Sequence, residues 1–217
     1  MSLLTSCPFL NLLFIFSMTS IIILDCCLLV SQISFSQYTW KLEKNKDGIQ
    51  VYTSPSPTTS YKSVRVECTF KGTYAKLISI LTNVKKFEDW IYHTKTTKLI
   101  RKNNHYDFVY YSETSMPWPL SNRDVVLRLN IRTDSLPKFL IIEGRNMRNE
   151  LPEMPYRVRV PHYLAKWKVT MPSAGQLQIS YILDVNPGGS IPAGVVNLFV
   201  DKGPYETFLN LKEELIK

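Results

Sequence analysis

The sequence predicts an α+β fold in which a long amphipathic helix lies across a curved antiparallel sheet. Three observations predict it. Several segments alternate apolar and polar residues with a period of two, two stretches among them have helical spacing, and a longer helical stretch follows the last of them. The 217 residues, 45% of them hydrophobic and 20% charged, are enough for one globular domain with a sizeable core.

Alternation with a period of two predicts seven or eight strands. Each strand has one apolar face and one polar face, and residues 163–170 show the pattern, with the lysines on the polar side. The basic side chains are therefore expected on the outer, solvent-facing side of the sheet. The predicted strands are Ile49–Thr53, Tyr61–Lys71, Thr94–Lys102, Tyr106–Thr114, Asp124–Thr133, Lys138–Gly144, Tyr156–Met171 with a break near Pro161, and Leu177–Asn186.

Helical spacing predicts three helices. Thr73 is placed to cap a helix over Tyr74–Leu81, and a second helix is predicted over Val84–Tyr92. The third covers Ile191–Lys217 and is expected to kink at Gly203-Pro204, because proline removes the hydrogen bond to the residue four positions back. Its apolar side is formed by Val196, Phe199, Val200, Phe208, Leu211 and Leu215.

Residues 1–36 are predicted to be a signal peptide or an N-terminal membrane segment, and residues 37–217 to be the folded domain. Up to Tyr38 the sequence has no Lys or Arg and a single acidic residue, and Phe9–Phe16 and Ile21–Val30 are two apolar stretches. This composition is typical of segments that are exported or inserted into a membrane.

Two interpretations of this segment stay open. Ser34 and Ser36 lie at the −3 and −1 positions of a cleavage before Gln37, which favours a signal peptide that begins at the first methionine or at Met18. A retained anchor is the alternative, because about 20 apolar residues span a bilayer. We expect export to the periplasm or the extracellular space, with membrane anchoring if the segment is retained.

Cysteine and histidine patterns predict neither a disulfide nor a metal site. Only Cys68 lies within residues 37–217, so no internal disulfide is expected there. His93, His105 and His162 lack the close paired spacing of zinc ligands. The sequence also has no Gly-rich phosphate loop, no G-x-S-x-G and no H-E-x-x-H motif. We therefore expect neither a metal nor another cofactor.

Short motifs follow one another in a distinctive order from residue 40 onward. They are Trp40, Asp47-Gly48-Ile49, Val51-Tyr52, Trp90, Pro117-Trp118-Pro119 with Arg123-Asp124, and Asn186-Pro187-Gly188-Gly189 with Ile191-Pro192 and Asn197. The most specific pair is PWPLSNRD and NPGGSIPAGVVN, about sixty residues apart. Together they resemble the START domain, the steroidogenic-acute-regulatory-related lipid-transfer module, over residues 40–217.

The resemblance implies a helix-grip fold of the Bet v 1-like, or SRPBCC, superfamily. In that fold a strongly bent antiparallel sheet wraps the C-terminal helix around an internal hydrophobic tunnel that holds a lipid or another hydrophobic molecule. The N-terminal helix of the longer family members is replaced here by residues 1–36. The functional expectation is non-enzymatic lipid binding, with transfer as a further step.

Arg123 is the first candidate for a ligand contact. If Val125 and Leu127 face inward, strand parity places Arg123 on the same side and Asp124 on the other. A buried guanidinium needs a partner, so Arg123 either holds a ligand head group or water at the polar end of the tunnel, or bonds the backbone of the loop over Met116–Asn122. Both readings stay open.

Other candidates are mostly aromatic. Trp118 and Trp167 either line the tunnel or belong to the core, and only one of Tyr110 and Tyr111 can face inward because they are neighbours on a strand. The Gly203-Pro204 pair is either a hinge for ligand entry or a static bend. The remaining ligand-binding candidates are Tyr181, Val196, Phe199 and Val200.

The formal net charge is +8, and residues 37–217 carry +9 because residues 1–36 contain only one charged residue, Asp25. The basic excess either keeps a solvated face soluble or attracts the protein transiently to an anionic membrane surface. Nucleic acid is not expected as a partner, because the Lys and Arg residues are spread over several β-strands and do not gather in one groove.

An enzyme of the same fold, cyclase-like or hydrolase-like, is the alternative function. It would need an acid/base pair that points inward, whereas the inward positions of the clear strands are almost wholly apolar. The sequence leaves Glu113 and Glu143 unplaced, so either carboxylate could face Arg123.

Overall fold

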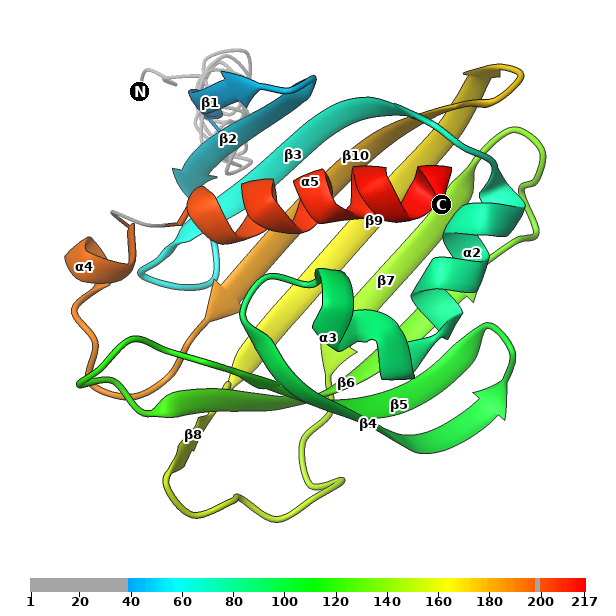
Figure 1. The fold of residues 1–217 in the computed structure, drawn as a ribbon. Coiled ribbons are helices and arrows are strands. Elements are labelled where there is room, and N and C mark those ends of the chain that lie inside the picture. Colours follow the sequence, from blue (N-terminus) through cyan, green and yellow to red (C-terminus); the bar gives the residue numbers. More distant parts are fainter. Residues whose placement is uncertain (1–38, 198–199) are drawn as a thin grey trace, which may run out of the picture. The chain divides into compact units, whose positions relative to one another are not determined.

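A ten-stranded sheet dominates the part of the chain that the computed structural model describes, residues 39–197 and 200–217 (Figure 1). Its order is β1-β2-β3-β10-β9-β7-β6-β5-β4, and the short β8 pairs in parallel with the beginning of β6. The strands are β1 (Lys41–Lys46), β2 (Ile49–Pro55), β3 (Lys62–Lys71), β4 (Thr94–Asn104), β5 (Asp107–Thr114), β6 (Asn122–Arg132), β7 (Leu140–Asn146), β8 (Arg157–Arg159), β9 (His162–Ser173) and β10 (Gln176–Asn186).

The sheet curves around the C-terminal helix α5 (Lys202–Ile216), which lies across one of its faces (Figure 1). We call the face toward α5 the inner face and the opposite one the outer face. The helices α2 (Tyr74–Thr82) and α3 (Phe87–Trp90) lie on the inner face as well, and both contact α5. The α+β helix-grip arrangement expected from the sequence is therefore confirmed.

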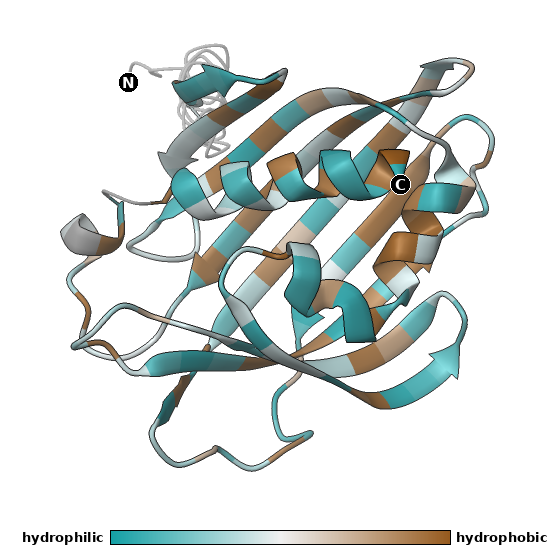
Figure 2. Ribbon diagram, in the orientation of Figure 1, coloured by the Kyte–Doolittle hydropathy of each residue, from teal (hydrophilic) through white to brown (hydrophobic). Residues whose placement is uncertain are grey.

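The alternation of apolar and polar residues along the strands corresponds to one buried and one exposed face, as predicted. Tyr181 of β10 pairs with Trp167 of β9 on one side and with Val66 of β3 on the other, and all three are buried. Bands of hydrophobic and hydrophilic residues alternate along these strands (Figure 2). All the predicted strands exist, and the break near Pro161 separates β8 from β9.

One strand, β1, was not predicted. Its sequence, KLEKNK, has no apolar alternation, because β1 is an edge strand and most of its side chains remain exposed. Lysines on an edge strand also discourage pairing with another chain. The backbone pairing with β2, rather than burial, defines this strand.

The first predicted helix is confirmed together with its cap. The Thr73 hydroxyl accepts a hydrogen bond from the Lys76 amide at 3.2 Å. The second predicted helix is shorter than expected: a 3₁₀ turn, η2 (Val84–Lys86), leads into the single turn of α3. Phe87 and Trp90 are nevertheless buried, and their rings meet edge to face at 5.8 Å between centroids.

The prediction of one long C-terminal helix kinked at Pro204 is wrong. The structure has a short helix α4 (Ala193–Asn197) and a separate helix α5 that begins at Lys202. Pro204 lies in the first turn of α5, where its missing N–H has no intrahelical partner to lose, so it does not bend the helix. The described residues give no support to a hinge at Gly203-Pro204.

The helix α5 is held by its apolar side and by polar contacts at the β1–β2 turn. Tyr205, Phe208, Leu211 and Leu215 are buried against the sheet. The Tyr205 hydroxyl donates to the Asp47 carboxylate, which raises the pKa of Tyr205 to about 12.

Residues 38–217 form one unit by their contacts, and the buried apolar residues of the described range all lie between Ile49 and Leu215. This range therefore contains the strands and helices that build its own core. The segment predicted to be a signal peptide or anchor, residues 1–36, lies outside the described residues. Within the described part, none of the helices has the length and the apolar character to span a membrane.

Candidate functional site

The inner face is tightly packed at one end of β10. Leu177 and Ile179 have no exposed surface, and several other core residues of the sheet and of α5 have none either. The fully buried neighbours include Leu140, Ile142, Val169 and Leu211. This end is an ordinary close-packed core.

Toward the other end of β10, inward-facing apolar side chains keep part of their surface exposed. Leu183 and Val185 lie on the same face as Ile179, and Tyr163 pairs with Val185 from β9. All three pack against the core cluster but are only half-buried. Three further half-buried residues of this kind come from the helical layer: Ile91, Val200 and Leu209.

Aromatic side chains mark the boundary between the two ends. Phe208 of α5 stacks on Trp167, with ring centroids 5.0 Å apart, and contacts Tyr181 at 5.2 Å. Trp167 and Tyr181 also contact each other at 4.8 Å. These three rings hold the middle of α5 against the sheet.

Three tyrosines bring hydroxyl groups to the inner face. Tyr110, Tyr163 and Tyr181 come from β5, β9 and β10, and the hydroxyls of Tyr163 and Tyr181 interact with each other. Burial raises the pKa of each phenol, for Tyr110 and Tyr181 well above its usual value. These groups are therefore neutral hydrogen-bond donors and acceptors at ordinary pH.

Arg123 lies on the inner face at the beginning of β6, and only 6% of its surface is exposed. Its Nη1 donates to the carbonyl of Ser121 and its Nη2 to the carbonyl of Gly188, at 3.4 Å. Its Nε has no hydrogen-bond partner, and no carboxylate of the described residues forms an ion pair with it. Burial accordingly lowers the pKa of Arg123. The predicted bonding of the loop backbone is observed, but it leaves the charge uncompensated.

The carboxylates that the sequence left unplaced lie on the outer face. Glu113 accepts hydrogen bonds from Arg157 and Asn122, both at 2.7 Å. Burial opposes ionisation of Glu113, but these hydrogen bonds outweigh it and lower its pKa. Glu143 pairs with Arg145 at 3.1 Å on the exposed side. Neither carboxylate faces Arg123.

Asp124 points to the outer face, as strand parity predicts. It is 1% exposed and forms a two-pronged pair with Arg159, whose Nε and Nη2 lie 2.9 and 3.0 Å from the carboxylate oxygens. The neighbouring outer cluster consists of Val109, Tyr111 and Val126. Of the two adjacent tyrosines, Tyr110 therefore faces inward and Tyr111 outward.

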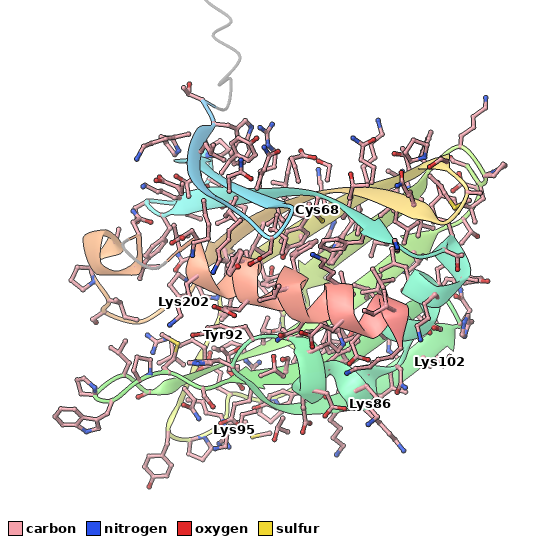
Figure 3. The ribbon with its side chains drawn as sticks, turned by 45° about the horizontal axis from the view of Figure 1, so that its top comes forward. Cys68, Lys86, Tyr92, Lys95, Lys102 and Lys202 are labelled. Atoms are coloured by element: carbon pink, nitrogen blue, oxygen red, sulfur yellow. The ribbon has the colours of Figure 1, made fainter. Side chains whose placement is uncertain are left out.

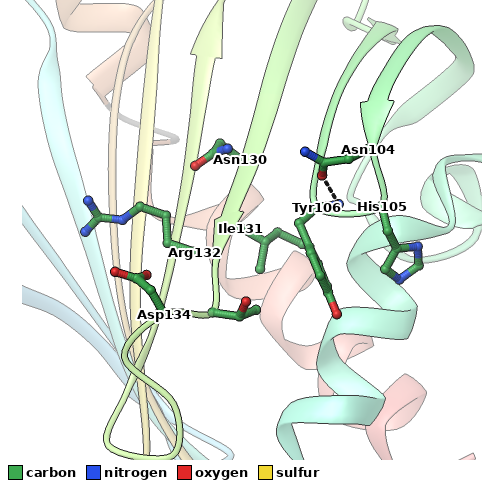
Figure 4. A pocket seen from close by; sticks show the side chains of 8 residues that line it. Asn104, His105, Tyr106, Asn130, Ile131, Arg132 and Asp134 are labelled. Carbon is green, nitrogen blue, oxygen red and sulfur yellow. Dashed lines mark hydrogen bonds between the residues drawn. The ribbon is translucent and has the colours of Figure 1, made fainter.

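Two hollows on the surface of the described residues include neither Arg123 nor the inward tyrosines. The larger, about 570 Å³, lies beside the β4–β5 turn and the end of β6 (Figure 4). Its lining includes His105, Tyr106, Arg132 and Asp134. The second, about 400 Å³, lies on the outer face and is bounded by Met147, Arg148 and Arg159 among others. In the described range, no group of three potential metal-ligating side chains comes together.

The model of the START domain family matches residues 25–212. The chain belongs to the START domain family. The resemblance stated from the motifs is thus confirmed, and the match begins within the segment that the sequence analysis assigned to export. Cys68, the one cysteine of the described residues, is buried in this START domain, and burial raises the pKa of its thiol.

Two relatives and one solved structure cover most of the chain. Uncharacterized protein PA1579 of Pseudomonas aeruginosa is 31% identical over 176 residues, which are 80% of this chain and 85% of that protein. Phosphatidylcholine transfer protein of Bos taurus is 24% identical, with 82% and 85% covered. The STAR-related lipid transfer protein from Xanthomonas axonopodis superposes with a TM-score of 0.75 at 26% identity, covering 82% of this chain and 99% of that one.

Only some of the predicted ligand-binding residues lie on the inner face of the START domain. Tyr110, Trp167, Tyr181 and Arg123 lie on the inner face, whereas Tyr111 does not. Val196, on α4, and Val200, which packs against the core, are half-buried, and Phe199 lies outside the described residues.

Trp118 neither lines the interior nor belongs to the core, so both sequence readings of this residue are wrong. It is 93% exposed in the loop between β5 and β6, where Pro117 and Pro119 flank it. Strand parity says nothing about a loop residue, and this loop carries the indole away from the sheet. The sequence reading also passed over Tyr163, Leu183 and Val185. Their alternation placed them on the inner face, but only packing reveals that they stay half-exposed.

Proposed function

We propose that this START domain binds a lipid or another hydrophobic small molecule between the inner face of the sheet and α5, and transfers it without chemical change. The observation that carries the proposal is the set of half-exposed apolar side chains on the inner face, with Tyr163, Leu183 and Val185 at its centre. Apolar surface that is half-buried, faces inward and adjoins a core is the lining that a hydrophobic ligand requires.

Tyr163 supports an enclosed space at this position. Burial raises its pKa as it does for Tyr110, which is almost wholly buried, and yet Tyr163 keeps accessible surface. Partial burial on the inner face beside half-buried apolar neighbours is what we expect of a phenol that lines a ligand cavity. A ligand in such a cavity gains about 2.5 kcal/mol for each 100 Å² of apolar surface removed from water.

The placement of the acids favours a carrier over an enzyme. The buried carboxylates of the described residues, Asp107, Glu113, Asp124 and Asp184, are all on the outer face and all hydrogen-bonded. The inner face instead offers a guanidinium and phenols with raised pKa, which bind and orient but are poor general bases. The relatives named as lipid-transfer proteins point the same way.

We further propose that the protein contacts an anionic membrane surface when it exchanges its cargo. Trp118 and Tyr156 are 93% and 94% exposed and precede β6 and β8, whose first residues Asn122 and Arg157 pair in parallel. They therefore lie at the same end of the molecule. Trp and Tyr side chains favour the membrane–water interface.

Basic side chains add an electrostatic attraction to anionic lipid. Lys95 and Lys86 lie at the periphery of the domain, and Lys202 lies beside Tyr92 at the beginning of α5 (Figure 3). The composition of residues 1–36 supports export or anchoring as the route by which the protein reaches its membrane.

The test is native mass spectrometry of residues 38–217 purified from a membrane-containing host, followed by organic extraction. We expect a stoichiometric adduct that disappears on extraction and a lipid of the same mass in the extract. A protein that is empty and also takes up no lipid from vesicles would contradict the proposal.

A further inference from the structure

Buried polar atoms without a hydrogen-bond partner gather on the outer face of β2, β3, β10 and β9. Six such side-chain atoms occur among the described residues, and four of them belong to Ser54, Ser63, Arg65 and His162. Ser54 pairs with Ser63 across β2 and β3, and continuing the register of β3 with β10 places Asp184 next to Ser63. Buried hydroxyl groups normally have partners, so this concentration requires an explanation.

Asp184 differs from the other buried carboxylates in how its charge is balanced. Among the described residues, Asp107, Glu113 and Asp124 each pair with an arginine, at 2.6 to 2.9 Å. Asp184 is 3% exposed, yet no lysine or arginine of the described range forms an ion pair with it. The basic group that contacts it is the imidazole of His162, whose Nε2 lies 3.4 Å from Oδ2 without forming a hydrogen bond.

The adjacent Arg65 is engaged elsewhere on the outer face. Its guanidinium lies over the rings of Tyr52 and Trp40, 4.5 and 4.9 Å from their centroids. Its Nε is 3.6 Å from the carboxylate of Glu67. The charge of this arginine is therefore directed to other partners, and Asp184 has no permanent cation beside it within the described part of the chain.

The loop between β2 and β3 closes over Asp184. Ser56 Oγ donates to one carboxylate oxygen of Asp184 at 2.8 Å, and the Thr58 hydroxyl donates to the other. Ser56 Oγ also accepts two amides of the loop, both at 3.1 Å, which closes the loop on itself. Ser54 and Ser63, which flank the loop in sequence, are 1% and 0% exposed, so their hydroxyls are closed off from bulk water.

A small cation would account for both the carboxylate and the hydroxyls. It compensates a buried negative charge and binds the lone pairs of hydroxyl oxygens that have no other partner. Neighbouring strands lie about 4.8 Å apart, so an ion above Ser63 is within reach of Ser54 on one side and of Asp184 on the other. Water would satisfy the hydroxyls but would leave the charge uncompensated.

The set of donor groups favours a monovalent ion. It consists of one carboxylate and neutral oxygens, whereas calcium sites generally combine several carboxylates. No group of three potential metal-ligating side chains comes together among the residues described, which also disfavours a transition metal.

We infer that this START domain binds a monovalent metal cation, Na⁺ or K⁺, on its outer face, held by the Asp184 carboxylate and the hydroxyls of Ser63 and Ser54. The site is separate from the inner face, and the inference does not depend on the proposed lipid binding.

The same loop connects the cation site to the chain before α5. The Tyr61 hydroxyl donates to the Ile191 carbonyl at 3.3 Å, and the Lys62 amide donates to Oδ1 of Asn197 at 3.0 Å. Both acceptors lie in the segment between β10 and α5. A cation at Asp184 therefore stabilises a loop that anchors this segment, and we expect it to stabilise the whole domain.

Differential scanning calorimetry of delipidated residues 38–217 tests the inference. Choline chloride, whose cation is too large for the site, is replaced stepwise by NaCl or KCl at constant ionic strength. The pH is alkaline, where an unperturbed imidazole is neutral. A ligand that binds only the folded state stabilises it, so we expect a saturable rise in melting temperature of about 3–6 °C when the cation exceeds its dissociation constant about tenfold.

Ser63→Ala distinguishes a ligand of the cation from an idle hydroxyl. Removing a buried hydroxyl that has no partner should leave the stability unchanged or raise it, whereas removing a ligand weakens cation binding. We expect Ser63→Ala to raise the dissociation constant at least about tenfold, and Asp184→Asn to abolish the cation dependence. The control is Asp134→Asn, which removes the same charge from an exposed position and should keep the dependence.

Thallium(I) locates the ion directly, because its anomalous scattering distinguishes it from water in a crystal. We expect an anomalous peak between Asp184, Ser63 and Ser54. An ordered water at this place, without anomalous signal, would overturn the inference.

Two calorimetric results would also overturn it. They are equal melting temperatures in choline, sodium and potassium chloride, and a cation dependence that stays unchanged in folded Ser63→Ala and Asp184→Asn. Stability that follows pH instead of the cation, and loses this dependence in His162→Gln, would assign the balancing charge to the imidazole and contradict the inference as well. If Asp184→Asn does not fold, Ser63→Ala and the anomalous signal still decide. Lipid capture is measured separately, so the proposed function stands or falls independently.

Discussion

Val185 and Ile179 lie on the inner face of β10, six residues apart, and they differ in how completely their surroundings are filled. Ile179 has no exposed surface, whereas Val185 is half-buried beside Tyr163. A phenylalanine at each position adds a ring to the same strand and the same face. The two substitutions therefore report directly on whether there is space at each end of the inner face.

The expected magnitudes differ clearly. Overpacking a filled core costs about 1–3 kcal/mol. For a domain of this size each 1 kcal/mol shifts the melting temperature by about 2–4 °C, so Ile179→Phe should lower it by about 2–12 °C. Val185→Phe places its ring in the proposed cavity, and we expect the melting temperature to stay within about 2 °C of the wild type or to rise.

Differential scanning calorimetry of delipidated residues 38–217 measures the stabilities, and lipid extraction after incubation with vesicles measures the cargo. Val185→Phe should lower the amount of captured lipid, because the ring occupies the space that the ligand needs. Equal destabilisation by the two substitutions would refute the reasoning, since it would mean that the space around Val185 is already filled. Unchanged lipid capture by Val185→Phe would refute it as well.

Three further predictions concern the surface and the polar contacts. Replacing Trp118 and Tyr156 together by alanine should weaken binding to phosphatidylserine-containing vesicles about tenfold, equivalent to about 1.4 kcal/mol. Vesicle co-sedimentation measures the binding, and Leu42→Ala is the control at another exposed apolar residue. Unchanged co-sedimentation of the double variant would contradict the membrane contact. Asp124→Asn leaves the Arg159 charge without its partner and should cost about 3–5 kcal/mol in urea unfolding, and a loss below about 1 kcal/mol would show that the pair is dispensable. Hydrogen bonds from Thr53 and Lys41 lower the pKa of Glu43 to about 2, below the unfolded value of 4.5, so its contribution to stability is complete above about pH 4.5 and is lost as the pH falls toward 2. Glu43→Gln should flatten this acid limb of the stability profile, and identical acid limbs for the two proteins would contradict the assignment.

The strands could be predicted from the sequence wherever the two faces of the sheet have different environments. In the middle of β9 and the first half of β10 every second residue is buried, so the pattern is local and readable. The edge strand β1 escaped prediction because neither of its sides is buried enough to produce a pattern. The break in the helical stretch before Lys202 was not predicted, because Pro204 was interpreted as a kink within one long helix. Proline is also favoured in the first turn of a helix, and this is where Pro204 lies.

The candidate site could be predicted only in part, for a related reason. Parity along one strand placed Arg123 inward and required that only one of Tyr110 and Tyr111 face inward, and the structure shows that Tyr110 is the one. Which acid pairs with which base depends on strand order, so the sequence could not show that Glu113 meets Arg157 rather than Arg123. The half-exposure of Val185 is a property of packing between β10 and the helical layer, and no local pattern encodes it.

A crystal structure of residues 38–217, purified from the host without delipidation, tests the central claim most directly. The account predicts continuous elongated density between Leu183, Val185 and α5. Side chains in direct contact across this region, with no room for a ligand, would contradict it.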